Sequence, residues 1–177
     1  EHLPRLVRNY YKKYFPQYAR CATRIATVSE FSRNDIHTLY NVPLEKIDVV
    51  YNGVSGAFQP LIEAEKKLIR QKYTNSCEYF VYAGSLHPRK NIENLFRAFA
   101  VFKDKTNSDM KMVVVGEAMF LAKSIQSVYD KHPDKKDIVF TGRVSDKDMN
   151  YLVGASYAMT YVPYFEGFGI PILEAFA

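Results

Sequence analysis

The sequence has 177 residues, of which 47% are hydrophobic and 24% are charged. These proportions are typical of a globular protein and exclude a mainly disordered chain, and the length allows one domain with part of another. The formal charge of +5 suits an anionic partner, such as a nucleotide or an acidic membrane surface, although many soluble proteins carry a similar charge. The two cysteines, Cys21 and Cys77, lie far apart without metal-ligand spacing, which predicts free thiols in a reducing compartment.

The ends of the sequence predict a piece of a longer protein. The chain begins at Glu1 rather than Met and ends at Ala177, partway through a predicted helix, so we expect a fold that is truncated at its C-terminus. A signal peptide is not recognisable, and no apolar run is long enough to span a bilayer. These features predict a cytoplasmic protein.

Residues 2–23 predict a helix in which aromatic and basic side chains are interleaved and which Pro16 interrupts. A basic, aromatic helix can lie on the inner face of an anionic membrane, which would make the protein peripheral. The alternative is a helix that packs on the rest of its own domain and turns its lysines to solvent. We favour this alternative, because Pro16 spoils a continuous amphipathic face.

The next segments predict one β-α-β unit with parallel strands. Its strands are residues 24–29 and 47–51, and its helix is residues 30–39, with Ser29 as the N-cap. The following connection is rich in glycine and proline up to Pro60, which is typical of a domain boundary.

From residue 78 onward, strands and helices alternate, which predicts an α/β fold with a doubly wound parallel sheet. The predicted strands are residues 78–83, 110–115, 137–141 and 157–161, and the predicted helices are residues 63–73, 92–105, 120–131, 146–155 and a last one that begins at Ile170. Ligands of such sheets bind outside the carboxyl ends of the strands. The candidate segments at these ends are residues 84–91, 116–117, 142–144 and 164–169.

The last of these segments predicts a glycosyl-nucleotide site. Gly167 and Gly169 let the backbone pass close to a ligand, and the helix that starts at Ile170 offers free N–H groups to a phosphate. Glu166 and Glu174 flank this segment. A carboxylate beside a phosphate is electrostatically unfavourable. We therefore expect both glutamates to accept hydrogen bonds from ribose or sugar hydroxyls.

Arg89 and Lys90 predict a second contact with the phosphates. They lie at the start of a helix, where cations are disfavoured unless an anion intervenes. Lys90 can neutralise a diphosphate as a mobile point charge, and Arg89 can bind phosphate oxygens as a fork.

Several segments resemble, in the same order, motifs of the retaining glycosyltransferases of family 4, which have the GT-B architecture. Residues 161–177 resemble the Glu-x7-Glu motif of that family, residues 82–91 its phosphate-binding loop, and residues 139–144 its base-contacting turn. Residues 27–36 and 47–54 resemble the segment that leads to its interdomain linker. The resemblance implies that residues 58–177 are an incomplete C-terminal, Rossmann-like domain that binds the nucleotide sugar. Residues 1–57 would be the end of the N-terminal, acceptor-side domain and the linker.

The resemblance also implies a reaction, which is transfer of a hexosyl group from a UDP- or GDP-sugar to an acceptor hydroxyl with retention of configuration. The acceptor would be a saccharide or a lipid-linked saccharide, in polysaccharide or glycolipid synthesis. Metal and cofactor are not expected, because the family needs none, the histidines are scattered and no Asp-x-Asp motif occurs. The acceptor site and the usual catalytic histidine would lie in the N-terminal domain, so His87 is not assigned that role and the fragment is expected to be inactive.

The implied site residues fall into two groups. The catalytic group is Glu166, Lys90 and Arg89. The donor-binding group is Gly84, Ser85, Arg89, Lys90, Gly142, Arg143, Val144, Glu166, Gly167, Phe168, Gly169, Ile170 and Glu174. Ser85 departs from the arginine that many members of that family carry directly after the glycine matching Gly84.

Two other functions fit parts of the sequence. A non-catalytic nucleotide-binding module on the same scaffold would bind nucleotide without turnover. A nucleic-acid-binding protein would use the basic, aromatic N-terminus, but no recognition motif supports it, and we expect no nucleic-acid partner.

Overall fold

The structure is a computed structural model that describes residues 4–116 and 123–177. The chain forms two compact units. The N-terminal unit comprises Glu1–Gly53 and Glu166–Gly169, and the C-terminal unit comprises Val54–Phe165 and Ile170–Ala177. The assignment of residues 1–57 to an acceptor side and of residues 58–177 to a donor side stays a prediction.

The N-terminal unit contains the predicted β-α-β unit. Its elements are α1 (Arg5–Cys21), β1 (Ile25–Thr27), α2 (Glu30–Tyr40), a 3₁₀ turn (Leu44–Lys46) and β2 (Ile47–Val49). The two strands are parallel, as predicted, with Ile25 opposite Ile47. The Ser29 hydroxyl accepts a hydrogen bond from the Ser32 N–H at 3.1 Å, which confirms Ser29 as the N-cap of α2.

The prediction that Pro16 interrupts the first helix is wrong, because α1 continues through it. A proline inside a helix removes one backbone hydrogen bond but does not have to end the helix. The aromatic side chains of α1 therefore follow one another at helical spacing along a single face. The ring centroids of Tyr10 and Tyr14 are 4.8 Å apart, and those of Tyr11 and Phe15 are 4.5 Å apart.

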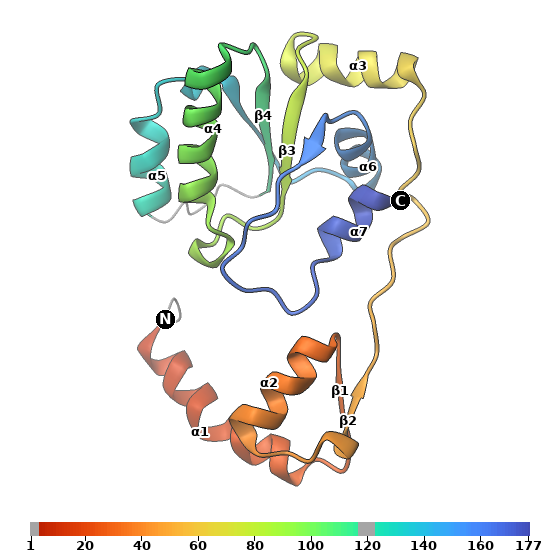
Figure 1. The fold of residues 1–177 in the computed structure, drawn as a ribbon, viewed down its shortest axis with the longest axis vertical. Coiled ribbons are helices and arrows are strands. Elements are labelled where there is room, and N and C mark those ends of the chain that lie inside the picture. The colour runs from red at the N-terminus through yellow and green to blue at the C-terminus, as the bar shows by residue number, and fades with distance from the viewer. Residues whose placement is uncertain (1–3, 117–122) are drawn as a thin grey trace. The chain divides into compact units, whose positions relative to one another are not determined.

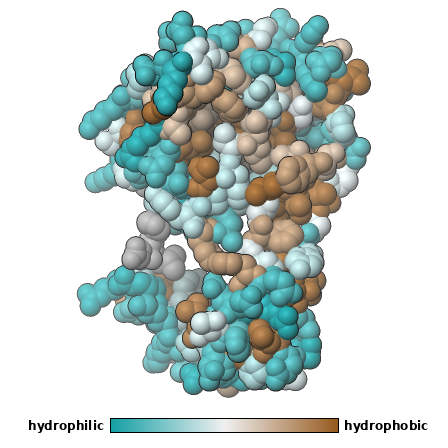
Figure 2. Space-filling view, in the orientation of Figure 1, coloured by the Kyte–Doolittle hydropathy of each residue, from teal (hydrophilic) through white to brown (hydrophobic). Residues whose placement is uncertain are grey.

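This aromatic face is exposed within the described part of the N-terminal unit. No residue of α1 is buried, and Leu6, Tyr10 and Tyr18 are all exposed. Figure 2 shows hydrophobic side chains set among hydrophilic ones on the displayed surface of this unit. Because α1 is continuous through Pro16, it has an uninterrupted amphipathic face.

The C-terminal unit is the predicted doubly wound parallel sheet. Its strands are β3 (Tyr79–Ala83), β4 (Lys111–Val115), β5 (Ile138–Gly142) and β6 (Ala158–Met159). Its helices are α3 (Glu63–Thr74), α4 (Ile92–Thr106), α5 (Lys123–Asp130), α6 (Asp146–Gly154) and α7 (Ile170–Phe176), and short 3₁₀ turns occupy Pro88–Lys90 and Lys135–Asp137. The strand order is β5-β4-β3-β6, with all neighbours parallel. Residues 117 and 120–122, which belong to predicted segments, lie outside the described residues.

The alternation of side chains along the strands explains why helices cover both faces of this sheet. On one face, Tyr82 and Val114 pack against Phe96 of α4, with Ile125 of α5 in the same core. On the other face, Val81 and Val113 belong to a second core with residues of α6 and with partly buried residues of α3. Figure 1 shows α4 and α5 on one side of the sheet and α6 on the other.

The last predicted strand is shorter than expected. The sequence predicts strand over residues 157–161, whereas β6 pairs only Ala158 and Met159 with β3. Both the N–H and the hydroxyl of Thr160 donate to the carbonyl oxygen of Val81, at 2.7 and 3.0 Å. The regular ladder ends at this point, so residues 161–165 need other contacts to hold them.

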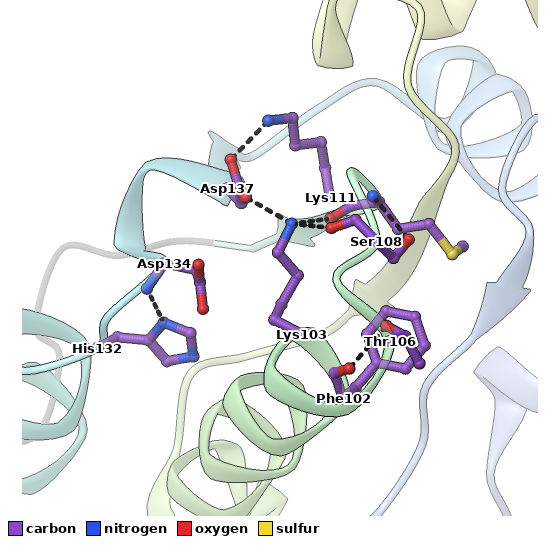
Figure 3. A network of polar contacts seen from close by, with 9 residues as sticks. Phe102, Lys103, Thr106, Ser108, Lys111, His132, Asp134 and Asp137 are labelled. Atoms are coloured by element: carbon purple, nitrogen blue, oxygen red, sulfur yellow. Dashed lines mark hydrogen bonds and ion pairs between the residues drawn. The ribbon is translucent and has the colours of Figure 1, made fainter.

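A buried ion network lies at the end of the sheet where β4 and β5 begin (Figure 3). The loops that follow the carboxyl ends of the strands are at the other end. The Asp137 carboxylate binds the Lys103 ammonium at 2.7 Å and the Lys111 ammonium at 2.5 Å. The side chains of Asp137 and Lys103 are only 6% and 9% exposed. Lys103 also donates to the carbonyl oxygens of Ser108 and Met110, so the network ties the end of α4 to the starts of β4 and β5.

Candidate functional site

The loop after β3 begins at a glycine whose backbone conformation other residues rarely adopt. Gly84 has a φ of 145°, and the loop then passes through a 3₁₀ turn to Asn91, which is left-handed at a φ of 61°. The loop is also closely packed, because a Cβ on Gly116 would lie 2.1 Å from the Gly84 carbonyl oxygen. Residue 116 must therefore be glycine, since the turns after β3 and β4 meet backbone to backbone.

Arg89 and Lys90 lie in the 3₁₀ turn directly before α4, and both are half-buried. The Lys90 ammonium lies 5.7 Å from the ring centroid of Tyr161. The Arg89 guanidinium donates from Nη1 to the Phe165 carbonyl oxygen at 3.0 Å. Both cations are therefore on the same side of the C-terminal unit as the segment that follows β6, near the positive end of the α4 dipole.

The predicted base-contacting turn follows β5. Gly142 has a φ of 71°, and its carbonyl oxygen accepts hydrogen bonds from the Gly116 N–H at 3.1 Å and the Thr141 hydroxyl at 3.1 Å. Two donors thus already use this carbonyl.

Glu174 lies in α7 and is half-buried. It lines a cavity of about 310 Å³ together with residues that include Gln59, Lys66, Asn150 and Tyr157. Burial raises the pKa of the Glu174 carboxyl group, and the negative charge of Asp146 adds to the rise. Hydroxyl donors from a ligand would stabilise the carboxylate and oppose this effect.

The residues 166–169 of the Glu-x7-Glu motif belong to the N-terminal unit. The Gly167 carbonyl oxygen accepts hydrogen bonds from the Ser29 and Ser32 hydroxyls at 2.5 and 3.5 Å, and the Phe168 ring lies 6.1 Å from the Tyr51 ring. Gly169 has a φ of 94°, a conformation that favours glycine. The structure thus groups Arg89, Lys90, Ile170 and Glu174 in one unit and Glu166, Gly167, Phe168 and Gly169 in the other.

Asn94 and Tyr164 make contacts at the site that the sequence did not predict. The Asn94 side chain donates to the Tyr164 hydroxyl at 3.1 Å, and the Tyr164 N–H donates to the Arg89 carbonyl oxygen at 3.0 Å. These partners are about 70 positions apart in the sequence, and periodicity carries no signal for such contacts.

No group of three or more His, Cys, Asp or Glu side chains that could hold a metal ion occurs among residues 4–116 and 123–177. Within the same residues, no helix combines the length and the apolar character that a membrane span needs.

The parallel sheet with helices on both faces defines a doubly wound α/β protein, a class in which ligands bind outside the carboxyl ends of the strands. Comparison with family models then specifies the family. The model of the glycosyl transferases group 1 matches residues 65–177, and that of glycosyltransferase family 4 matches residues 1–57. The chain belongs to the glycosyl transferases group 1 family, which confirms the resemblance and the fold class predicted from the sequence.

Two curated relatives are bacterial mannosyltransferases. The chain is 31% identical to O-antigen chain mannosyltransferase B of Escherichia coli, over 99% of this chain and 46% of the relative. It is also 31% identical to O-antigen chain mannosyltransferase RfbU of Salmonella typhimurium, over 89% of this chain and 40% of the relative. The chain thus spans less than half the length of these two relatives.

Two solved structures share the fold. The structure of Anabaena Alr3699/HepE in complex with UDP and glucose has a TM-score of 0.76 at 20% identity, over 89% of this chain and 43% of that one. WaaG, a glycosyltransferase involved in lipopolysaccharide biosynthesis, has a TM-score of 0.75 at 19% identity, over 94% of this chain and 48% of that one.

Proposed function

We propose that the protein transfers a hexosyl group from a UDP- or GDP-sugar to an acceptor hydroxyl, with retention of configuration and without a metal ion. The acceptor would be a saccharide or a lipid-linked saccharide in polysaccharide or glycolipid synthesis. The observation that carries this proposal is the pair Arg89 and Lys90, half-buried before the N-terminus of α4 in a chain of a glycosyltransferase family. The O-antigen mannosyltransferases among the relatives support the polysaccharide assignment.

The proposed mechanism depends on stabilising the leaving group. When the bond from the sugar to the nucleoside diphosphate breaks, negative charge grows on the diphosphate. Donors that bind this charge more strongly in the transition state than in the substrate lower the barrier. Lys90 and Arg89 would supply two of these donors. The dipole of the 15-residue helix α4 acts in the same direction.

The other site residues would bind and orient the donor. Glu174 would accept hydrogen bonds from the ribose hydroxyls, and Glu166 would contact the transferred sugar near its anomeric carbon. Backbone N–H groups of Gly167, Phe168, Gly169 and Ile170 would bind the diphosphate. The turn at Gly142, Arg143 and Val144 would contact the base, and Gly84 and Ser85 would line the phosphate loop.

A thermal-shift panel on the full-length protein tests donor binding. We expect either UDP or GDP to raise the melting temperature, and ADP to have no effect. A ligand that binds only the folded state adds about 2.7 kcal/mol of stability at one hundred times its dissociation constant. The alternative of a non-catalytic module predicts the same shift but no turnover of the matching nucleotide sugar. If no nucleoside diphosphate gives a shift, the donor assignment is wrong.

We also propose that α1 contacts the cytoplasmic face of an anionic membrane. The helix carries Arg5, Arg8, Lys12, Lys13 and Arg20 and no acidic residue. Its aromatic face is continuous and exposed within the described part of the unit. A helix that is basic on one side and aromatic on the other lies in the membrane interface.

The charge of α1 gives a test of this contact. We expect Lys12→Glu/Lys13→Glu to weaken binding of the full-length protein to vesicles with about one third anionic lipid by about tenfold or more, since each basic residue near such a surface contributes substantially. Vesicle co-sedimentation measures the effect, with the exposed Lys105→Glu as control. Equal binding of both variants would favour the alternative in which α1 packs on its own domain.

A further inference from the structure

We propose that Arg89, Asn91 and Asn94 form a positioning clamp that holds residues 162–165 against the loop that carries Lys90. The clamp itself is a feature of the C-terminal unit, and its effect on catalysis rests on the proposed function. Residues 162–165 immediately precede Glu166, so the clamp fixes the point at which the chain enters the Glu-x7-Glu motif. Arg89 thereby has a positioning role in addition to any contact with phosphate.

The need for a clamp follows from the length of β6. Only Ala158 and Met159 pair with β3, and the ladder ends at Thr160. Tyr164 and Phe165 are exposed and cannot be held by burial. Residues 162–165 therefore depend on specific hydrogen bonds rather than on the sheet or the core.

Arg89 both accepts a hydrogen bond from this segment and donates one to it. Its carbonyl oxygen accepts a hydrogen bond from the Tyr164 N–H at 3.0 Å. Its Nη1 donates to the Phe165 carbonyl oxygen, also at 3.0 Å. The backbone groups of two successive residues are thus bound by one arginine, which fixes their orientation as well as their distance.

Asn91 supplies the second contact and combines two properties. It adopts the left-handed conformation that begins α4, and its Nδ2 donates to the Val162 carbonyl oxygen at 2.9 Å. Its Oδ1 accepts a hydrogen bond from Nδ2 of Asn94 at 2.8 Å. The amide orientation is thereby determined, and an aspartate at this position could not donate to Val162.

Asn94 completes the clamp from the first turn of α4. Its Nδ2 also donates to the Tyr164 hydroxyl at 3.1 Å, and its Oδ1 accepts from Nη1 of Arg97 at 2.7 Å. Asn91 and Asn94 thus link the start of α4 to Val162 and Tyr164, two positions apart in the segment that follows β6. Since a misplacement of about 1 Å can reduce an enzymatic rate by about 100-fold, such links matter for the residues that follow.

Hydrogen–deuterium exchange tests the clamp without depending on activity. In the full-length protein we expect Asn91→Gly to increase exchange across residues 161–166 by about threefold to tenfold, which is the loss expected for one hydrogen bond. Glycine keeps the left-handed conformation, so only the side-chain contacts are removed. Asn107→Gly is the matched control, because Asn107 is also left-handed, at the other end of α4.

A second variant covers the case in which Asn91→Gly alters the helix start. Asn94→Ala removes the contact with Tyr164 and retains a good helix former, and we expect it to increase exchange in the same segment. If exchange across residues 161–166 matches the wild type in both variants, the clamp does not exist.

Turnover separates the clamp from the proposed function. With the nucleotide sugar that the wild type uses, we expect Asn91→Gly to lower kcat by about tenfold and to change KM little, since the clamp places reacting groups rather than binding the donor. A wild type without turnover would overturn the proposed function, whereas the exchange result would still decide the clamp. An unchanged kcat in a variant with increased exchange would overturn the positioning role.

Discussion

Lys90→Ala is expected to reduce kcat/KM of the full-length protein for its nucleotide sugar by about 100-fold or more. Loss of one preorganised donor to a developing negative charge typically has an effect of this size. Lys90 precedes α4 directly and lies against the Tyr161 ring, so its ammonium group is held in place before the diphosphate departs. Steady-state kinetics with the nucleotide sugar that supports turnover measures the effect.

Two further variants make the Lys90 result specific. Lys105→Ala removes an exposed charge from the last turn of the same helix and is expected to leave kcat/KM unchanged. Lys90→Arg keeps the charge and is expected to recover part of the activity, although an arginine presents its donors in a different geometry. Wild-type kcat/KM in Lys90→Ala would show that this lysine does not act on the leaving group.

The second large effect concerns stability rather than activity. Asp137→Asn is expected to lower the free energy of unfolding by about 3 kcal/mol, because it leaves the ammonium groups of Lys103 and Lys111 without their carboxylate. The Lys103 side chain is only 9% exposed, so water cannot fully replace the lost partner. Urea denaturation at pH 7 measures the change.

The same carboxylate gives stability a pH dependence. Burial alone would raise the pKa of Asp137, but the hydrogen bonds and charges of Lys103 and Lys111 outweigh burial and lower it. Because the folded pKa lies below the unfolded value of about 3.9, this contribution is fully present above that pH. It is lost as the pH falls through the folded pKa.

Asp137→Asn should therefore be less sensitive to acid below about pH 4 than the wild type, although it is less stable at pH 7. Asp109→Asn is a suitable control, because Asp109 is exposed near the same end of the sheet. Equal denaturation midpoints of Asp137→Asn and Asp109→Asn at pH 7 would contradict the importance of the network.

Most of the architecture could be predicted because it depends on local patterns. The continuous apolar run at residues 110–115 predicts a central strand covered on both faces, and Val113 and Val114 indeed belong to opposite cores. Ser29 and Asn41 cap the two ends of α2, and both are residue types that commonly cap helices. Such signals require only neighbouring residues.

Two predictions about element boundaries were wrong. Pro16 does not end α1, since losing one backbone hydrogen bond is tolerated within a long helix. The predicted strand at residues 157–161 is reduced to two residues, because pairing with β3 covers only Ala158 and Met159. Neither outcome is visible in hydrophobic periodicity.

In the candidate site, too, the sequence predicts the positions of residues along the chain but not their contacts with distant residues. The positions of Gly84, Arg89 and Lys90 after a strand and before a helix follow from the sequence. The contacts of Arg89 with Phe165 and of Asn94 with Tyr164 do not, because they join residues that are distant in the chain. The catalytic and donor-binding roles themselves stay predictions that the experiments above address.

The strand order has a consequence for the way in which the chain folds. β3, β4 and β5 pair in the order in which they occur, so each strand docks beside the one made just before it. β6 must instead return to the other edge of β3, where Ala158 pairs with Phe80. Closing that longer loop costs more entropy, and during synthesis β6 leaves the ribosome after β3, β4 and β5. We therefore expect the three-stranded sheet to assemble before β6, and the segment that carries Glu166, join it.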